Sequence, residues 1–481
     1  MPNLNLVATA PLLFLSGWAC LLLLADLWIP KNRKSITAWL ALLGLVITCG
    51  LVLPQLSLRE EAFGGMLAID GFAGILHLIF LGTGGLSVLL ALNFLRHQNI
   101  ERGEFYPLLL FSVVGMMTMG MAQDMIVVLL ALEVLSIPLY VLAGFARARS
   151  DSEESALKYF LLGAFSSAFL VYGVALVYGA TEATGFGAIE AAIIGGGAAT
   201  PLLVAGVGLI LVGLGFKVGI VPFHMWTPDV YEGAPSVVTA FMSVGAKAGG
   251  FAALIRVFFG PFDLLSLEWV PAIAVFAALS MIIGNIAAIV QSSIKRMLAY
   301  SSIAHAGYIL MTFVAGGQGE LAGFAASSAL FYLSAYAFTN MGAWAVVLAV
   351  EKQEGLGNKI DDFAGLGRTH PALSLAMALF MLSLTGLPPT MGFIGKFYVF
   401  SVVLEAGYVW LALVGVITSL ISAYYYLRVI VMIWMHEGPG LAITPRPLNF
   451  TVALTALGTL VFGLLPGPVM TLVETSVLGL F

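Results

Sequence analysis

The stretch that decides the fold is GLGFKVGIVPFHMWTPDVYEGAPSVVTAFMSVGAKAGG, residues 213–250. It consists of two apolar segments joined by a polar connector that contains prolines, and each segment has one lysine inside it, Lys217 and Lys247. A charge near the middle of a membrane span costs about 2.5–3.5 kcal/mol on insertion scales. An ionisable residue at such a position therefore predicts a functional site, and this stretch contains two.

The apolar composition predicts an integral membrane protein. Of the 481 residues, 60% are hydrophobic and 9% are charged, and the mean hydropathy is +1.04, which is more apolar surface than a soluble core can bury. Apolar segments of about 20 residues recur along the chain, without the ten-residue alternation of an outer-membrane barrel. Because backbone polar groups in lipid must be satisfied within a helix, we predict an all-α polytopic fold.

We predict about fourteen transmembrane helices. They cover residues 6–28, 36–56, 71–94, 106–122, 125–144, 156–180, 201–223, 237–259, 269–290, 303–315, 321–350, 371–405, 408–435 and 450 to about 472. The first has no basic region before it and is long enough to be retained, unlike a signal peptide. The longest connectors, 181–200 and 351–370, are too short for a soluble catalytic domain. We therefore expect the function to lie within the bilayer.

Lysine and arginine are distributed unevenly between the two sides of the membrane. Fourteen of the twenty lie in loops that join an odd-numbered span to the next even-numbered one, or at the end of span thirteen and its loop. Lys295 and Arg296 are among them, in the predicted loop between spans nine and ten. The opposite side holds only Arg59 and Arg256. By the positive-inside rule the richer side is the interior, so we predict that both termini face outward.

Four lysines and one glutamate lie inside spans. The lysines are Lys158, Lys217, Lys247 and Lys396, and the acid is Glu133, near the middle of the fifth span. Burial favours the neutral form of each group, whereas a nearby opposite charge favours the charged form. Whether each group keeps its proton thus depends on how close its partner is, and we interpret Glu133, Lys217, Lys247 and Lys396 as a proton route.

Each member of this set has a structural alternative. Glu133 could be only a hydrogen-bonding acid, Lys217 could extend to the interface, and Lys247 could be a buried ion-pair partner. Lys396 could simply cap a break in its helix. Lys247 lies about ten residues into its span, beyond the reach of a lysine stem, so extension to the interface is not an alternative for it.

Three further residues are possible relays. Lys158 lies near the start of the sixth span, where an interfacial position is as consistent as a function. His224 and His305 are single histidines, which more often serve as interfacial or hydrogen-bonded residues than as proton relays. None of the six histidines has the spacing of a metal or haem site.

Glycine and proline interrupt the seventh and twelfth spans beside their lysines. Pro222 follows Lys217, and Pro388 and Pro389 precede Lys396 in LTGLPPTMGFIGK, residues 384–396. A proline has no backbone donor, so each one leaves a carbonyl unpaired that must face protein or water. We expect both helices to be broken there, in a hydrated interior.

Two interrupted spans with a charge at each break are typical of inverted-repeat transporters. The shift from the seventh span to the twelfth is odd, so it reverses the direction through the membrane. We predict three N-terminal helices in residues 1–105, a first repeat of helices four to eight in 106–260, and a second repeat of helices nine to thirteen in 261–436. A last helix occupies 437–481.

Three motifs resemble the subunit N family of respiratory complex I, the NADH–quinone oxidoreductase. They are GFKVGIVPFHMWTPDVYEGAP at 215–235, QSSIKRMLAYSSIAHAGY at 291–308 and LTGLPPTMGFIGKFYVF at 384–400, and the resemblance covers essentially the whole chain. It implies an antiporter-like fold and proton pumping driven by quinone reduction elsewhere in the complex. It places a glutamate–lysine pair on Glu133 and Lys217, a connecting lysine on Lys247 and a terminal lysine on Lys396; Lys158 also matches.

The resemblance further implies that this chain carries no cofactor, and that NADH, FMN, iron–sulfur clusters and quinone belong to partner subunits. The expected partners are other membrane-arm subunits, among them a neighbouring antiporter-like subunit and small membrane subunits, in a bacterial inner membrane. Cys20 and Cys49 lie in separate spans and indicate neither an iron–sulfur cluster nor a disulfide framework. The net charge of −5 is spread along the chain and argues against a nucleic-acid partner.

Two other functions stay open from the residues alone, a component of a multisubunit Na⁺/H⁺ antiporter and a non-catalytic scaffold. The antiporter chains tend to have LPDAH-x-EAP where this chain has TPDVYEGAP, at 227–235. A lysine at position 396, where some relatives carry glutamate, also favours subunit N.

Overall fold

The structure is a computed structural model that describes residues 4–195, 200–352 and 356–477. Its helices are α1 (Ala10–Asp26), α2 (Ser35–Val52), α3 (Gly71–His97), α4 (Phe105–Met121), α5 (Met125–Ala143), α6 (Ser150–Thr181), α7 (Phe186–Ile194), α8 (Pro201–Val218), α9 (Trp226–Gly233), α10 (Ser236–Phe241), α11 (Lys247–Phe258), α12 (Ser266–Ile289), α13 (Ile294–Leu310), α14 (Glu320–Val350), α15 (Leu366–Thr369), α16 (Pro371–Thr385), α17 (Met391–Glu405), α18 (Val409–Met435), α19 (Arg446–Leu464) and α20 (Gly467–Val477). A short antiparallel hairpin pairs β1 (Glu60–Ala62) with β2 (Leu67–Ile69).

The prediction of an all-α polytopic membrane protein is confirmed. Within the described residues, twelve helical segments are long and apolar enough to cross a membrane, and α4 and α16 are shorter apolar helices. Together they correspond to the fourteen predicted spans, with α17 completing the twelfth. The hairpin is too small to change this class.

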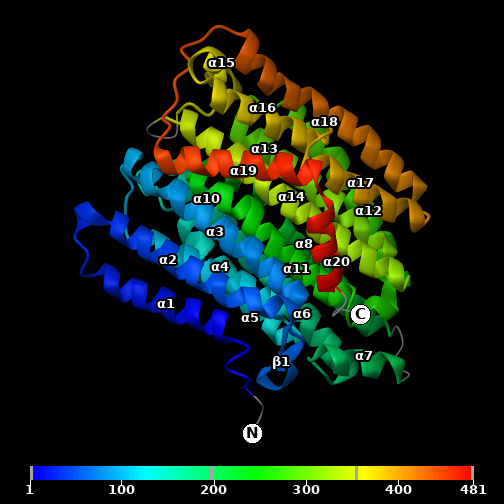
Figure 1. Cartoon of the computed structure of the whole chain (residues 1–481). Helices are drawn as coiled ribbons and strands as arrows, with labels where there is room; N and C mark the ends of the chain where they lie inside the picture. Colours follow the sequence, from blue (N-terminus) through cyan, green and yellow to red (C-terminus); the bar gives the residue numbers. More distant parts are fainter. Residues whose placement is uncertain (1–3, 196–199, 353–355, 478–481) are drawn as a thin grey trace.

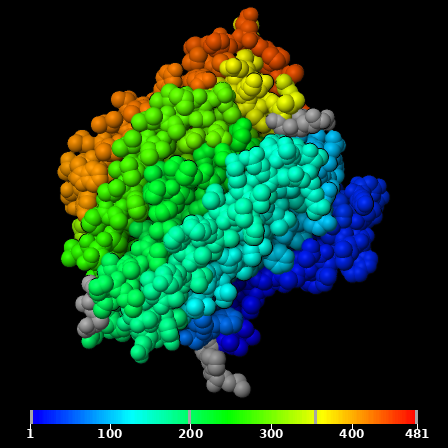
Figure 2. All heavy atoms as spheres, turned by 180° about the vertical axis from the view of Figure 1, so that it is seen from behind, coloured from blue at the N-terminus to red at the C-terminus, as the bar shows by residue number. Residues whose placement is uncertain are grey.

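The long helices lie side by side in one array, whose order in space broadly follows the sequence. In Figure 1, α1 and α2 form one flank and α18 the opposite flank, while α7 and the hairpin lie at the other end of the helices from α15. Figure 2, from behind, shows the same succession from the N-terminal helices to the orange C-terminal ones. The middle of the array is therefore enclosed by protein on both flanks.

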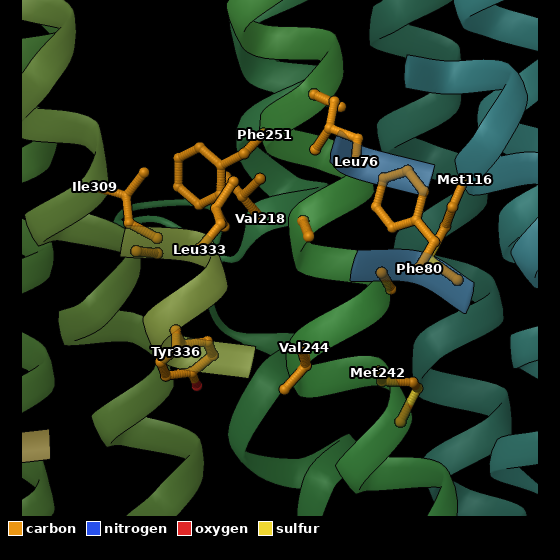
Figure 3. Close-up of a cluster of buried hydrophobic side chains, with 14 of the residues drawn as sticks. Leu76, Phe80, Met116, Val218, Met242, Val244, Phe251, Ile309, Leu333 and Tyr336 are labelled. Carbon is orange, nitrogen blue, oxygen red and sulfur yellow. The ribbon is translucent and has the colours of Figure 1, made fainter. Parts of the chain in front are cut away.

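The most buried segment is the eighth predicted span. It comprises α10, a π-helical segment at Met242–Ala246 and α11. A stretch of 18 consecutive residues within it is entirely buried. In Figure 3, Phe251 of α11 lies beside Val218 and Leu333, and Met242 lies below Phe80 and Met116. The segment is thus packed in apolar side chains from α3, α4, α8 and α14.

Both predicted helix breaks are confirmed. α8 ends at Val218, and Gly219, at φ +71°, donates its N–H to the carbonyls of Gly215 and Phe216. α16 ends in the same way, with Gly386 at φ +89° donating to the carbonyls of Leu382 and Ser383. A proline follows three residues after each glycine, and the chain resumes as α9 and α17. These left-handed glycine caps satisfy carbonyls that would otherwise be unpaired in the membrane.

The two breaks are also packed against neighbouring helices in the same way. α6 packs against both α8 and α9, and α14 packs against both α16 and α17. Each long helix therefore spans the break of its neighbour. This is the relation that a shift of five spans predicts, although the repeat boundaries at 106–260 and 261–436 stay a prediction.

Several sequence boundaries were wrong. The tenth span does not start at residue 303, because Ser293 caps α13 by accepting a hydrogen bond from the backbone of Arg296. Lys295 and Arg296 are therefore helical residues and not loop residues. The last span is divided into α19 and α20, with Pro466 between them, and the connector 181–200 contains α7.

Arg256 lies within the predicted eighth span, in the last turn of α11, where its side chain is 1% exposed. Its two terminal nitrogens donate to the two carboxylate oxygens of Asp70, each at 2.7 Å, and its Nε donates to the carbonyl of Gly120 at 2.9 Å. Asp70 also caps α3 by accepting from the backbone of Ala73. This bidentate pair joins α3, α4 and α11 at one end of the array.

We predict that Asp70→Asn destabilises the folded subunit by about 3–5 kcal/mol, because it leaves a buried guanidinium without its partner. The matched control is Arg368→Ala, which removes an ion pair to Glu437 whose side chains are 75% and 82% exposed. That change should stay within about 0.5 kcal/mol. Heat stability of the purified assembly, followed on native gels, measures both, and equal melting of the two variants would contradict the assignment.

We also predict that Gly386→Ala lowers heat stability and proton pumping more than Gly407→Ala does. Both glycines have φ above +80°, so both variants incur about 1–2 kcal/mol of backbone strain. A Cβ at position 386 would also lie 2.7 Å from Cδ of Lys396, whereas nothing lies within 4 Å at position 407. Heat stability and proton pumping of the assembled variants measure the difference, and identical behaviour would show that the contact with Lys396 is unimportant.

Candidate functional site

Lys217 is held by two neighbouring helices at the end of α8. Its Nζ donates to Oγ of Ser136 on α5 at 2.8 Å and to the hydroxyl of Tyr159 on α6 at 3.1 Å. The side chain is buried, and its ammonium lies 5.5 Å from the centre of the Tyr159 ring. Lys217 therefore does not extend to the membrane interface. α8 ends one residue after Lys217, inside the protein and not at a lipid-facing surface.

Glu133 lies on α5, one helical turn before Ser136, and is half-buried. Its Oε1 accepts a hydrogen bond from Ser167 of α6 at 2.6 Å. Among the ion pairs of the described residues there is none between Glu133 and Lys217, so the predicted pair is not in direct contact. Both groups instead bind hydroxyls of α6, Glu133 at Ser167 and Lys217 at Tyr159, and Lys217 also binds Ser136, one turn after Glu133 on α5.

Lys247 is the first residue of α11 and follows directly on the π-helical segment. It is 3% exposed, and its Nζ donates to the carbonyl of Ser302 on α13 at 2.6 Å. The glycines on either side of it, Gly245 and Gly249, pack against the side chain of Met116 on α4. No pattern in residues 242–246 predicts the π-helix, a feature that often marks functional positions.

Lys217 and Lys247 are connected through α11. A Cβ on Gly250 would lie 3.3 Å from Cγ of Lys217, so the stem of that lysine runs against the backbone of α11. Gly250 is three residues after Lys247, which is one helical turn. Lys217 thus contacts α11 one turn after the position of Lys247 on that helix.

His305 lies at the centre of a buried hydrogen-bond network. Its Nδ1 is 2.8 Å from the hydroxyl of Tyr332 on α14, and its Nε2 is 3.1 Å from the hydroxyl of Tyr426 on α18. Ser302, His305 and Tyr308 follow one another at helical spacing along α13. One face of α13 therefore extends from the carbonyl that binds Lys247 to the ring that contacts Lys396.

Lys396 lies two turns into α17 and reaches back to the break before it. Its Nζ donates to the carbonyl of Thr385, the last residue of α16, at 2.8 Å and to Oγ of Ser419 on α18 at 2.6 Å. The ammonium also lies 4.6 Å from the centre of the Tyr308 ring. The terminal lysine thus pairs with a carbonyl that the broken helix leaves unused.

The structure does not bring Lys158 or His224 into this row. Lys158 is 40% exposed and forms ion pairs of 2.7 Å with Glu154 and with Asp229. Asp229 in turn binds Arg296 at 2.8 Å. His224 is half-buried in the segment between α8 and α9. Both residues lie on the side where α9 meets the ends of α6 and α13.

Sequence reasoning missed the tyrosines and serines that connect the charges, as well as Lys295, which is fully buried. Serine and tyrosine are common within spans, so only their contacts distinguish Ser136, Tyr159 and Tyr426. Lys295 lies in a polar stretch, which made it look like a loop residue. Within the described residues, no group of three or more histidine, cysteine, aspartate or glutamate residues is placed to bind a metal ion.

Buried lysines on broken or π-distorted helices, inside a many-helix membrane protein, define an antiporter-like membrane subunit. Residues 122–422 match the family described as NADH:quinone oxidoreductase/Mrp antiporter, transmembrane. A chain of the Mrp complex from Dietzia sp. has the same fold, with a TM-score of 0.86 over 99% of this chain and 98% of its own, at 20% identity.

Closer relatives decide between the branches of this class. The subunit N of NADH-quinone oxidoreductase from Chloroflexus aggregans is 47% identical over 100% of this chain and 99% of its own. That from Trichlorobacter lovleyi is 43% identical, over 99% and 97%. A chain of respiratory complex I from Thermus thermophilus with bound aureothin is 36% identical, with a TM-score of 0.83 over 96% and 98%. The chain therefore belongs to the subunit N family of NADH–quinone oxidoreductase.

The ion pairs of Asp229 predict a pH dependence. Burial opposes its ionisation, but the hydrogen bonds to Lys158 and Arg296 outweigh this and hold the pKa of Asp229 below its usual value of 3.8. A lowered folded-state pKa contributes stability that is present above the unfolded pKa and is lost as the pH falls through the folded one. We expect acid-induced loss of heat stability below about pH 4 to be shallower in Asp229→Asn than in the wild type. Parallel acid curves would exclude this contribution.

Proposed function

We propose that Glu133, Lys217, Lys247 and Lys396 are the proton-carrying groups of this subunit, with His305 between the last two. By its family the chain is an antiporter-like, proton-translocating membrane subunit of NADH–quinone oxidoreductase, complex I. The observation that carries the assignment of residues is the continuous contact from α5 to α17 through α8, α11 and α13.

The contacts support a stepwise transfer along the row. Each lysine is bound by hydroxyl or carbonyl oxygens, and Lys217, Lys247 and Lys396 have no carboxylate within ion-pair distance in the described residues. A buried ammonium without a carboxylate is poorly compensated, so it can release its proton when a neighbour is ready to accept it. Serine and tyrosine hydroxyls both donate and accept, which suits them to pass protons between such groups.

Water completes the row in this proposal. Within the described residues, Oγ of Ser302 and the hydroxyl of Tyr336 are buried and interact with each other, but neither forms a hydrogen bond of good geometry. Both lie near Lys247 and His305, since Ser302 accepts from the lysine and the Tyr336 ring packs 5.1 Å from the imidazole. Buried polar atoms are rarely left with incomplete hydrogen bonding, so we propose that ordered water binds these two hydroxyls.

Energy for transport comes from outside this chain in our proposal. NADH, FMN, the iron–sulfur clusters and quinone are assigned to partner subunits, and the neighbours to other membrane-arm subunits, including an antiporter-like one. The protein is a multi-pass membrane protein, and we propose that both termini face the outer side. Lys158, which is bound by two carboxylates near the inner end, is assigned to the entrance of the row rather than to its interior.

The proposal predicts that Lys217→Ala leaves the complex assembled but lowers quinone-coupled proton pumping by about a hundredfold or more, the range that one positioned acid–base group contributes. Its position is fixed by contacts with Ser136 and Tyr159, so assembly does not depend on its charge. Pumping is measured in proteoliposomes with assembly checked on a native gel. Unchanged pumping would remove Lys217 from the mechanism and favour a scaffold subunit.

Arginine substitutions separate proton transfer from simple charge. Lys247→Arg and Lys396→Arg keep a positive charge, but a guanidinium does not release its proton at any relevant pH. We expect both to lose pumping, whereas the exposed Lys359→Arg should retain it. If a sodium gradient instead of quinone reduction drives the wild-type chain, the antiporter alternative holds.

A further inference from the structure

A second group of buried charges lies at the inner end of the molecule, outside the row described above. Glu351 follows directly on α14, and its side chain is 0% exposed. Within the described residues neither of its carboxylate oxygens has a hydrogen-bond partner, and the ion pair recorded for it is with Nη1 of Arg149, at 4.0 Å. Its carboxylate is therefore enclosed by protein, with one guanidinium at the limit of ion-pair distance.

Lys295 is the second member of this group. It lies in the first turn of α13, is 0% exposed, and donates to the carbonyl of Ala234 at 2.8 Å. The charges that act on it are those of Glu351, Glu232, Arg149 and Asp151. With all five groups ionised, three carboxylates face two cations. The cluster therefore carries one excess negative charge, which one bound proton neutralises.

The cluster lies beside a cavity. A hollow of about 210 Å³ is lined by Arg149 and Pro235 and by residues at the end of α3, among them Gln98 and Asn99. Pro235 follows Ala234, the residue that binds Lys295. This end of the molecule carries most of the loop lysines and arginines, so the cavity opens toward the inner side.

A polar line runs from this cluster to Lys247. Ser236, Thr239 and Ser243 precede Lys247 at spacings of three or four residues, and all three are 0% exposed. Oγ of Ser236 has no hydrogen-bond partner in the described residues. On the facing helix α13, Ser302 lies seven residues, or two turns, after Lys295 and binds Lys247. Both helices thus connect the cluster with the connecting lysine.

We propose that Glu351 and Lys295 form a proton-uptake site that reloads Lys247 from the inner side. The inference rests on the proposed role of Lys247. A proton from inner water binds the carboxylate of Glu351. The ammonium of Lys295 gives its proton through the serine and threonine hydroxyls to the neutral amine of Lys247, and the resulting neutral Lys295 takes the proton from Glu351. One proton enters and one is delivered, and only O–H and N–H bonds change.

Lys295→Arg tests the site most directly. Arginine keeps the positive charge that a purely structural ion cluster requires, but it cannot release a proton. In the assembled complex in proteoliposomes, we expect Lys295→Arg to lower proton pumping at least tenfold while the complex remains intact on a native gel. Lys352→Arg is the matched control, because Lys352 is adjacent to Glu351 and its side chain is 49% exposed. It should pump as the wild type does.

Glu351→Gln and Glu351→Asp provide an independent second test. The amide fills the same space but cannot bind the proton, so pumping should fall, most strongly when the inner pH is raised and protons are scarce. The shorter acid should restore much of the loss. Wild-type pumping by assembled Lys295→Arg, or equal pumping by the amide and acid variants at every inner pH, would overturn the proposal.

Lys247→Arg, measured in parallel, separates this inference from the proposed function. If Lys247→Arg loses pumping and Lys295→Arg keeps it, only the uptake site is wrong. If Lys247→Arg also pumps as the wild type does, the proposed row itself fails, and the uptake site fails with it.

Discussion

The constraint on which the structure depends is that a backbone in lipid must satisfy its own hydrogen bonds. Helices meet this requirement everywhere except at their ends, so an end inside the membrane has to be enclosed by protein. The ends of α8 and α16 are closed by Gly219 and Gly386, and the carbonyl of Thr385 at the second end binds Lys396. The breaks therefore create polar positions in an apolar interior, and the lysines lie at these positions.

The same constraint explains why the lysines bind oxygens of hydroxyl and carbonyl groups. A direct carboxylate partner would fix the charge of each lysine, since a buried ion pair is strongly destabilised by losing one member. Asp70 and Arg256 are such a pair, and they hold α3 and α11 together. Lys217, Lys247 and Lys396 have only hydroxyl and carbonyl partners, as the proposed change in their protonation requires. The charges that hold helices together and those we propose to carry protons thus have different kinds of partner.

Much of this architecture could be predicted from the residues. Length and hydropathy sufficed for the spans, and proline beside glycine sufficed for both breaks, because these signals are local. Glu133 and the three lysines were found because charge in an apolar run is conspicuous. The sequence could not show that Lys217 binds Ser136, that Tyr308 contacts Lys396, or that Lys295 is buried, since these facts depend on how distant helices pack. The π-helix before Lys247 is only five residues long, and no repeating pattern of apolar residues distinguishes it from an α-helix.

The pair between Asp70 and Arg256 also determines where the eighth span can deform. Arg256 anchors the far end of α11 to α3 and α4, and about 14 Å of regular helix separates it from Lys247. A rigid rod fixed at one end cannot slide along its axis. Any displacement of Lys247 must therefore be absorbed in the π-helical segment Met242–Ala246, where the hydrogen-bond pattern is already irregular. The eighth span thus has one end fixed to α3 and α4 and one irregular segment, which directly precedes Lys247.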